Sequence, residues 1–219
     1  MVDPNEAQAP AVDTVLEEPA GAEIPDVAAE SFFSDDLPVL TGKLMAVEAF
    51  LKLTVRDTPF QEFIRDILLV MVKAVKSEAG SDIECAADGS MFFRAAVGHG
   101  SDRVVRFMIP KGQGIAGHVA ESRQPLIVGN VEADKTHLKA ISTVVGFDAR
   151  NMLAAPIVVR GKVFAVVELL NRVGEGGYSE TDREVVNYLC EMAARAIEIR
   201  MMIAWSAQAR EKKDKEEAA

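Results

Sequence analysis

The sequence has few cysteines, few aromatic residues and no long apolar run. Two cysteines in 219 residues, Cys85 and Cys190, are too few for a disulfide framework and indicate reduced thiols. No stretch approaches the roughly 18 consecutive apolar residues that suggest a membrane-spanning helix. The N-terminus also lacks the positive start and apolar core of a signal peptide. We therefore expect a cytoplasmic protein that does not bind membranes.

Basic residues are absent from the first 42 positions, which hold ten acidic residues. The remainder carries 24 acidic and 24 basic residues, so the net charge of −10 belongs to the N-terminal segment. A neutral body without a basic stripe argues against nucleic acid as a partner. We expect a disordered acidic tail over residues 1–40, one globular domain over 41–204, and a charged helical or disordered extension over 205–219.

The sequence does contain a clear order of helices and strands. Apolar spacing predicts a helix over about 43–55, and a Thr-x-x-Gln capping box at Thr58–Gln61 begins a second helix that runs to about Ser77. Ser179 is predicted to cap a long final helix. Between these helices, strands are predicted at 82–88, 91–98, 102–110, 124–130, 151–159 and 162–171, with a short helix at 136–146. Strands joined by hairpins, with helices at the sides, indicate an α+β fold with a mainly antiparallel sheet.

The stretch KGQGIAGHVA, residues 111–120, contains G-x-G-x-x-G, which is the spacing of a dinucleotide-binding loop. Two residues separate it from the preceding strand, and the βαβ units that complete such a fold are missing. We therefore assign Gly112 and Gly114 to a tight turn, and Gly117 to close packing of a short helix on the sheet.

No arrangement of reactive side chains predicts catalysis. No two of the histidines stand at metal-ligand spacing, and neither cysteine lies near another type of ligand. The histidines are His99, His118 and His137. Glu168 is interpreted as a strand-surface residue, and Glu180 and Asp182 as residues at a helix start. We expect neither an enzyme nor a metal site.

Three stretches of the chain, residues 109–131, 150–172 and 178–198, resemble the GAF domain in their order and spacing. That family comprises small-molecule-binding regulatory modules of phosphodiesterases, cyclases, phytochromes and bacterial sensors. The resemblance covers about residues 44–204. It implies a six-stranded antiparallel sheet, with the N- and C-terminal helices on one face and a ligand pocket on the other.

Within that family, the sequence most resembles the cyclic-nucleotide-binding GAF domains of phosphodiesterases and adenylyl cyclases. Those domains carry an Asn-Lys…Phe…Asp-Glu signature after the last strand. Here the signature reads Asn171-Arg172, Tyr178 and Asp182-Arg183, so Arg183 departs from the family pattern. The resemblance implies that Arg172 and Asp182 form a structural ion pair that supports the pocket.

The resemblance also implies where a ligand binds. Ile115 and Ala116 would turn backbone N–H groups toward it, and the helix that faces the pocket would contribute further contacts. Those contacts would come from Thr136, His137, Ser142 and Thr143. The family residues that contact the base and the phosphate are not matched one for one in this sequence. The resemblance therefore suggests a cyclic nucleotide but does not determine the identity of the ligand. The cysteines that covalent bilin attachment or sulfoxide reduction needs are absent, so no covalently bound cofactor is expected.

Two functions are consistent with this resemblance. The first is a stand-alone regulatory sensor that binds a small ligand, such as a cyclic nucleotide, and signals through dimerisation or a partner. The alternative is an interaction and dimerisation module with a vestigial pocket and no ligand. In both, we expect a homodimer through the N- and C-terminal helices and a protein partner that receives the output.

Overall fold

The computed structural model describes residues 37–54, 56–104, 107–134 and 146–217. The helices in these ranges are α2 (Leu37–Thr54), α3 (Phe60–Ala74), α4 (Ser101–Val104), α5 (Gly114–Ser122) and α7 (Glu180–Glu217). The strands are β1 (Ser77–Cys85), β2 (Met91–Val97), β3 (Met108–Ile109), β4 (Leu126–Val128), β5 (Met152–Val159) and β6 (Lys162–Arg172). None of the described helices is both long enough and apolar enough to cross a membrane.

The six strands form one sheet in the order β3-β2-β1-β6-β5-β4, and every neighbouring pair is antiparallel. Strands β1 and β6 lie at its centre, with Ser81 opposite Glu168 and Asp82 opposite Val167. This sheet confirms the expected α+β fold. It also excludes a dinucleotide-binding fold, which is built on parallel strands.

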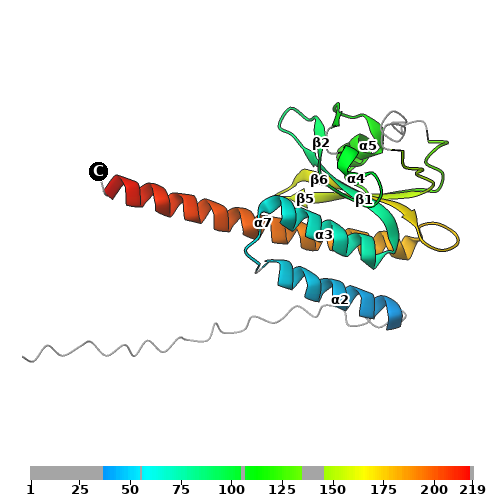
Figure 1. The fold of residues 1–219 in the computed structure, drawn as a ribbon, viewed down its shortest axis with the longest axis horizontal. Coiled ribbons are helices and arrows are strands. Elements are labelled where there is room, and N and C mark those ends of the chain that lie inside the picture. Colours follow the sequence, from blue (N-terminus) through cyan, green and yellow to red (C-terminus); the bar gives the residue numbers. More distant parts are fainter. Residues whose placement is uncertain (1–36, 55, 105–106, 135–145, 218–219) are drawn as a thin grey trace, which may run out of the picture. The chain divides into compact units, whose positions relative to one another are not determined.

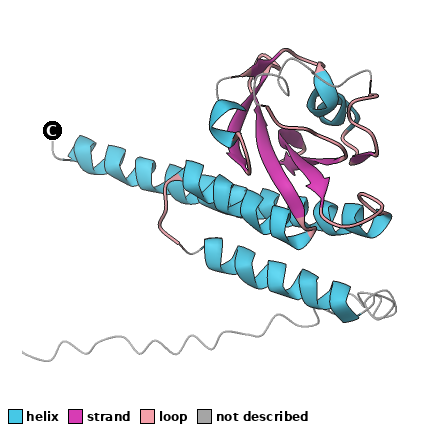
Figure 2. Ribbon diagram, turned by 45° about the vertical axis from the view of Figure 1, so that its right-hand side comes forward, coloured by secondary structure: helices cyan, strands magenta, loops and turns pink. Residues whose placement is uncertain are grey.

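Helices cover both faces of the sheet (Figure 1). Helices α3 and α7 pack on one face and form what we call the helix-face core, while α5 packs on the opposite face and forms the pocket-face core. Helix α7 contributes Val186, Leu189, Ala193 and Ile197, all fully buried and spaced three or four residues apart, as expected for one helical stripe. Helix α2 packs against α3 and α7, so the helical side has two layers (Figure 2).

The central strand β1 begins earlier than expected. The predicted helix to Ser77 is wrong, because α3 ends at Ala74 and Lys76 takes a left-handed φ of 53° that turns the chain into β1. Gly80 lies in this strand where α3 crosses closely, since a Cβ there would stand 2.8 Å from Val72 Cγ2. A residue that reads as a loop signal is therefore a packing requirement in a buried strand.

The start of α3 also differs from the expectation. Pro59 is the residue that precedes the helix, and no side chain caps it, so the proposed capping box of Thr58 and Gln61 is wrong. Instead, the guanidinium of Arg200 in α7 donates to the carbonyl oxygen of Thr58. The predicted strand over 102–110 is wrong as well, because only Met108–Ile109 pairs in the sheet and Ser101–Val104 forms α4. Residues Gly98 and Gly100, both at positive φ, redirect the chain before α4.

The glycine-rich stretch makes the turn that begins α5. Gly112 and Gly114 have φ values of 70° and 74°, which confirms their assignment to a tight turn. Gly117 packs closely against that turn. The prediction that it packs on the sheet is wrong. A Cβ at Gly117 would lie 2.6 Å from the carbonyl carbon of Gly112. The turn and the first part of α5 are therefore packed into one rigid unit.

The two terminal helices are longer than expected. Helix α2 begins at Leu37, not near residue 43, and α7 continues to Glu217. The last part of α7 continues beyond the sheet (Figure 1), and residues 202–207 are exposed.

Candidate functional site

A pocket lies on the pocket face of the sheet, beside the first turn of α5. Its volume is about 90 Å³. The walls are mainly apolar side chains from β2, β3, α5, β5 and β6. They include Phe93, Val97, Ile109, Ile115, Met152 and Leu170. The polar side chains around it are Ser81, His99, Ser101 and Glu168.

Ile115 and Ala116 line this pocket, as the resemblance implied. The two side chains are buried, because the glycine turn brings the first turn of α5 onto the sheet. The backbone N–H of Ala116 interacts with the carboxyl of Glu168, a protein group. The other expected contacts, Thr136, His137, Ser142 and Thr143, lie outside the described residues, so their role stays a prediction.

Glu168 is the acid of this pocket. It lies on the central strand β6, between Ser81 of β1 and Ala154 of β5, and its side chain lines the pocket. Burial raises the pKa of Glu168 to about 7, and the N–H of Ala116 partly opposes this effect. The interpretation of Glu168 as a strand-surface residue is wrong, because α5 covers this face of β6. A single acid within the apolar run VVELL was the signal in the sequence.

A second acid is buried on the opposite face of the same two strands. Asp82 faces the helix-face core, since it pairs with Ala95 and Val167 of that core. Its side chain is 1% exposed, and neither carboxylate oxygen has a hydrogen-bond partner among the described residues. Burial, together with the nearby Glu84 carboxylate, raises the pKa of Asp82 to about 8.

The signature residues Arg172, Tyr178 and Asp182 join the end of β6 to the start of α7. Arg172 Nε lies 2.8 Å from Asp182 Oδ2, which is the ion pair that the resemblance implied. The N–H of Ser179 donates to the same oxygen at 2.8 Å, and the N–H of Asp182 donates to Ser179 Oγ at 3.1 Å. Ser179 thus caps α7 as predicted. Tyr178 Oη lies 2.7 Å from Ser77 Oγ and ties this junction to β1.

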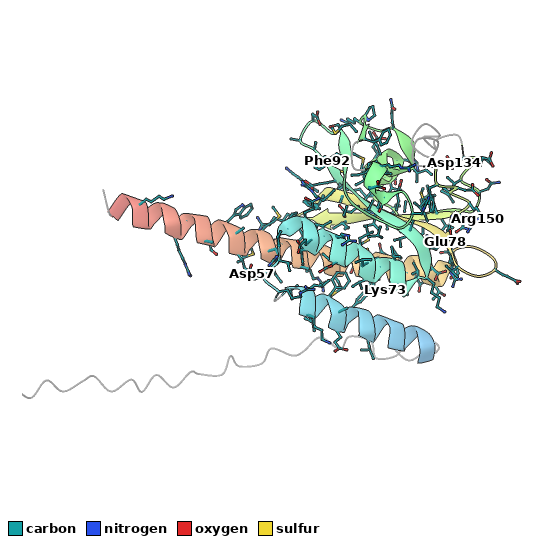
Figure 3. The ribbon with its side chains drawn as sticks, in the orientation of Figure 1. Asp57, Lys73, Glu78, Phe92, Asp134 and Arg150 are labelled. Atoms are coloured by element: carbon teal, nitrogen blue, oxygen red, sulfur yellow. The ribbon has the colours of Figure 1, made fainter. Side chains whose placement is uncertain are left out.

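Asn171 holds the segment that enters β5. It is buried at a positive φ of 55°, and its Oδ1 accepts the N–H of Arg150 at 2.7 Å. Its Nδ2 donates to Glu78 Oε2 at 2.9 Å. Glu78 also pairs with Arg150, whose side chain lies beside it (Figure 3), at 2.6 Å. None of the signature residues lines the pocket. They join the end of β6 to the start of α7, to β1 and to the segment that enters β5, and their support of the pocket stays a prediction.

The reactive side chains do not gather in the pocket. Cys85 packs at the pocket-face core and Cys190 within the helix-face core, and neither lines the pocket. Burial raises the pKa of both thiols, which disfavours the reactive thiolate. Among the described residues, no group of three potential ligands could hold a metal ion.

The family model of the GAF domain matches residues 61–197. The chain belongs to the GAF domain family. Curated relatives include the rod cGMP-specific 3',5'-cyclic phosphodiesterase subunit alpha of Canis lupus familiaris, which is 32% identical over 79 residues. That match covers 36% of this chain and 9% of the subunit. The cone cGMP-specific 3',5'-cyclic phosphodiesterase subunit alpha' of Mus musculus is 33% identical over 98 residues, which is 45% of this chain and 11% of that subunit. The matched segments thus span about a tenth of the length of these relatives.

Solved structures share the fold at low sequence identity. The GAF domain of a phosphoenolpyruvate-protein phosphotransferase from Coxiella burnetii superimposes with a TM-score of 0.63 at 16% identity, covering 80% of this chain and 98% of that one. The A. aeolicus nlh2 GAF domain superimposes with a TM-score of 0.61 at 18% identity, covering 74% of this chain and 99% of that one. The free methionine-R-sulfoxide reductase from Neisseria meningitidis superimposes with a TM-score of 0.59 at 16% identity, covering 74% of this chain and 93% of that one. At this identity the likeness shows the fold alone.

Proposed function

We propose that this GAF domain is a regulatory module that binds a small organic ligand in the pocket beside α5. The observation that carries the proposal is an apolar pocket with one half-buried acid, Glu168, at the centre of the sheet. Apolar walls with a few convergent polar groups are typical of small-molecule sites. The opposite face of the same strands packs against α3 and α7. A ligand that moves the sheet therefore changes the helical surface that a second copy or a partner protein would contact.

A cyclic nucleotide is the specific ligand that we propose to test first, because the names of several relatives carry cGMP. The pocket is small, with a volume of about 90 Å³. Ligand pockets usually measure about 300–1,000 Å³. A nucleotide would therefore require the walls around α5 to move apart from the sheet.

We further propose that the module is regulatory and not catalytic. Enzymes share this fold, as the sulfoxide reductase from N. meningitidis shows by its name. Thiol chemistry in the pocket would need a cysteine there, and neither Cys85 nor Cys190 lines it. An assay of free methionine-R-sulfoxide reduction tests this point, and turnover above that of a variant with both cysteines changed to serine would contradict it.

Thermal denaturation in the presence of a compound panel tests ligand binding. The panel contains cyclic mono- and dinucleotides, purines and small metabolites. A ligand at 100 times its Kd should stabilise the fold by about 2.7 kcal/mol. The variants Ala116→Trp and Ala96→Phe fill the pocket from α5 and from β2, and should abolish the shift. Ala204→Trp, on the exposed part of α7, is the matched control. A shift that survives both pocket variants would place the site elsewhere, and a panel without any shift would reject the sensor.

A homodimerisation module with a vestigial pocket is the second candidate, and two observations favour it. The cavity is small, and the last part of α7 presents exposed apolar side chains. Ile199, Met202 and Ile203 are 47%, 54% and 55% exposed and lie on one side of the helix. Leu44 and Leu51 of α2 are also exposed, at 62% and 59%. These side chains are suited to a helix bundle with a second copy.

Sedimentation velocity tests the dimer. Met202→Glu places a charge on the apolar stripe and should yield monomers, whereas Ala204→Glu, on another side of α7, should leave the dimer intact. A wild-type chain that sediments as a monomer at tens of micromolar, roughly the Kd range of weak association, would reject this proposal.

A further inference from the structure

The described lining of the pocket carries acidic charge without a basic lysine or arginine. Among the described residues that line it, Glu168 is the acid and there is neither lysine nor arginine. His99 lies at its edge and is exposed. The remaining described lining is apolar apart from the hydroxyls of Ser81 and Ser101. Within the described lining, charge complementarity to a ligand therefore depends on Glu168.

The carboxyl of Glu168 can accept more hydrogen bonds than the described residues donate to it. A carboxylate offers about four acceptor positions. The N–H of Ala116 engages it, and no described side chain donates a hydrogen bond to it. The neighbouring strands supply Ser81 and Ala154 beside it, and neither of these residues is charged. An acceptor that is half-buried and incompletely satisfied favours a ligand that brings donors.

Glu168 makes the start of α5 less favourable for an anion than a free helix N-terminus. Anions commonly bind the free N–H groups at a helix N-terminus. Here the first-turn N–H of Ala116 already interacts with Glu168, which brings a negative charge to that position. A phosphate or carboxylate ligand would be placed close to a like charge, and no described lysine or arginine lines the pocket to compensate.

We propose that this pocket selects a small molecule with a cationic or N–H-donating group, which Glu168 binds as hydrogen-bond acceptor, and that it disfavours anions. The inference rests on the proposed ligand-binding function and narrows its ligand class away from cyclic nucleotides, which are anions. An amidinium or guanidinium is the best geometric match, because it donates two parallel N–H···O bonds to a carboxylate. The small volume of the pocket, about 90 Å³, suits such a molecule with a small apolar body.

Three flat aromatic probes of the same size test the charge preference. Benzamidine is a cation with paired N–H donors, benzamide is neutral, and benzoate is an anion. We expect benzamidine to bind at least about tenfold more tightly than benzoate at pH 7.5, since its N–H donors form charge-assisted hydrogen bonds with the Glu168 carboxylate. Binding is measured by titration of backbone amide NMR signals, which also reports whether residues around the pocket respond.

The variants assign the preference to one side chain. Glu168→Gln keeps the shape of the side chain and should remove the advantage of benzamidine over benzamide. The matched control Glu62→Gln changes an exposed carboxyl on α3 and should leave all three affinities unchanged. Benzamidine affinity should rise as the pH passes through about 7, where Glu168 ionises. His99 is the other titratable group of the described lining, so the rise must persist in His99→Gln.

The outcomes separate this inference from the proposed function. Benzoate or cyclic AMP binding in the pocket as tightly as benzamidine would overturn the inference and leave ligand binding intact. The inference is also overturned if Glu168→Gln keeps its preference for benzamidine, or if benzamidine does not bind at about 10 mM, above the roughly millimolar Kd typical of a weak fragment. Failure of the complete compound panel, nucleotides included, would reject the proposed function itself.

Discussion

Replacement of Asp82 by asparagine should stabilise this GAF domain, and the gain should grow with pH. The Asp82 carboxyl is 1% exposed, and its two oxygens lack a hydrogen-bond partner among the described residues. The neighbouring cation, Arg94, is occupied by Glu84, to which it donates through Nε at 2.7 Å and through a second nitrogen at 3.0 Å. The thiols of Cys85 in β1 and Cys190 in α7 also interact with Asp82. An ionised Asp82 would therefore be a buried charge without a dedicated partner.

The magnitude follows from the pKa of Asp82 in the two states. The value is 3.8 in a model peptide and about 8 in the fold. Between these values the folded chain keeps a proton that the unfolded chain releases, so the free energy of unfolding falls as pH rises. The slope is about 1.4 kcal/mol per pH unit, which amounts to about 3 kcal/mol between pH 5 and pH 7. Below about pH 4 both states are protonated and this cost disappears.

Urea denaturation of the wild type and Asp82→Asn at pH 5, 6 and 7 measures the effect. The free-energy difference between the two proteins should widen by about 3 kcal/mol over this range. Contributions from other groups, including Glu168, cancel in the difference. Asp57→Asn changes an exposed carboxyl and should give a nearly constant difference from the wild type. A difference for Asp82→Asn that does not change with pH would show that the ionised carboxyl has a partner, and would refute the reasoning.

Two further substitutions test the scaffold of the pocket. Gly117→Ala places a Cβ 2.6 Å from the carbonyl carbon of Gly112, so overpacking should cost about 1–3 kcal/mol in thermal denaturation. Gly129→Ala, where a Cβ would meet no atom within 4 Å, is its control, and equal losses would contradict the packing argument. Asp182→Asn removes the partly buried charge that pairs with Arg172 and should cost about 1–3 kcal/mol. Glu180→Gln changes a more exposed carboxyl in the same turn and should cost less than about 1 kcal/mol.

Several features of the fold could be predicted from local sequence because local chemistry determines them. The hairpin between β5 and β6 turns at Arg160 and Gly161, and both residues take positive φ. Ser179 and Asp182 form the reciprocal cap that begins α7, and the alternation of strands and tight turns indicated an antiparallel sheet. In each case the residues that form the turn or the cap are close in sequence. Their local preference therefore determines the structure, and tertiary packing does not change it.

The first half of β1 could not be predicted because its sequence, Ser77-Glu-Ala-Gly-Ser, resembles a loop. Small residues there are required by the close approach of α3, which only the folded chain reveals. The capping box at Thr58 failed for a similar reason, since the carbonyl of Thr58 is bound by Arg200, more than a hundred residues later. Contacts between distant segments replaced the local rule in both places.

The candidate site was predicted in part. Ile115 and Ala116 were placed correctly at the pocket because the glycine turn before them determines their position. Glu168 was missed because a charged residue in a strand is ordinarily assigned to the solvent. Its burial depends on which strands flank β6 and on α5 covering them, and neither can be read from the residues around it.

The buried Asp82 and the half-buried Glu168 lie at neighbouring positions of adjacent strands but have different consequences for a ligand. Glu168 pairs with Ser81 and faces the pocket, whereas Asp82, the next residue, faces α3 and α7. A ligand that donates hydrogen bonds to Glu168 offsets the desolvation of that carboxyl, and the relief adds to its binding free energy. The same ligand cannot reach Asp82, because the sheet lies between them. The cost at Asp82 therefore persists in the bound and free states alike, so it lowers stability without affecting ligand selection, and substitutions at the two acids separate fold stability from recognition.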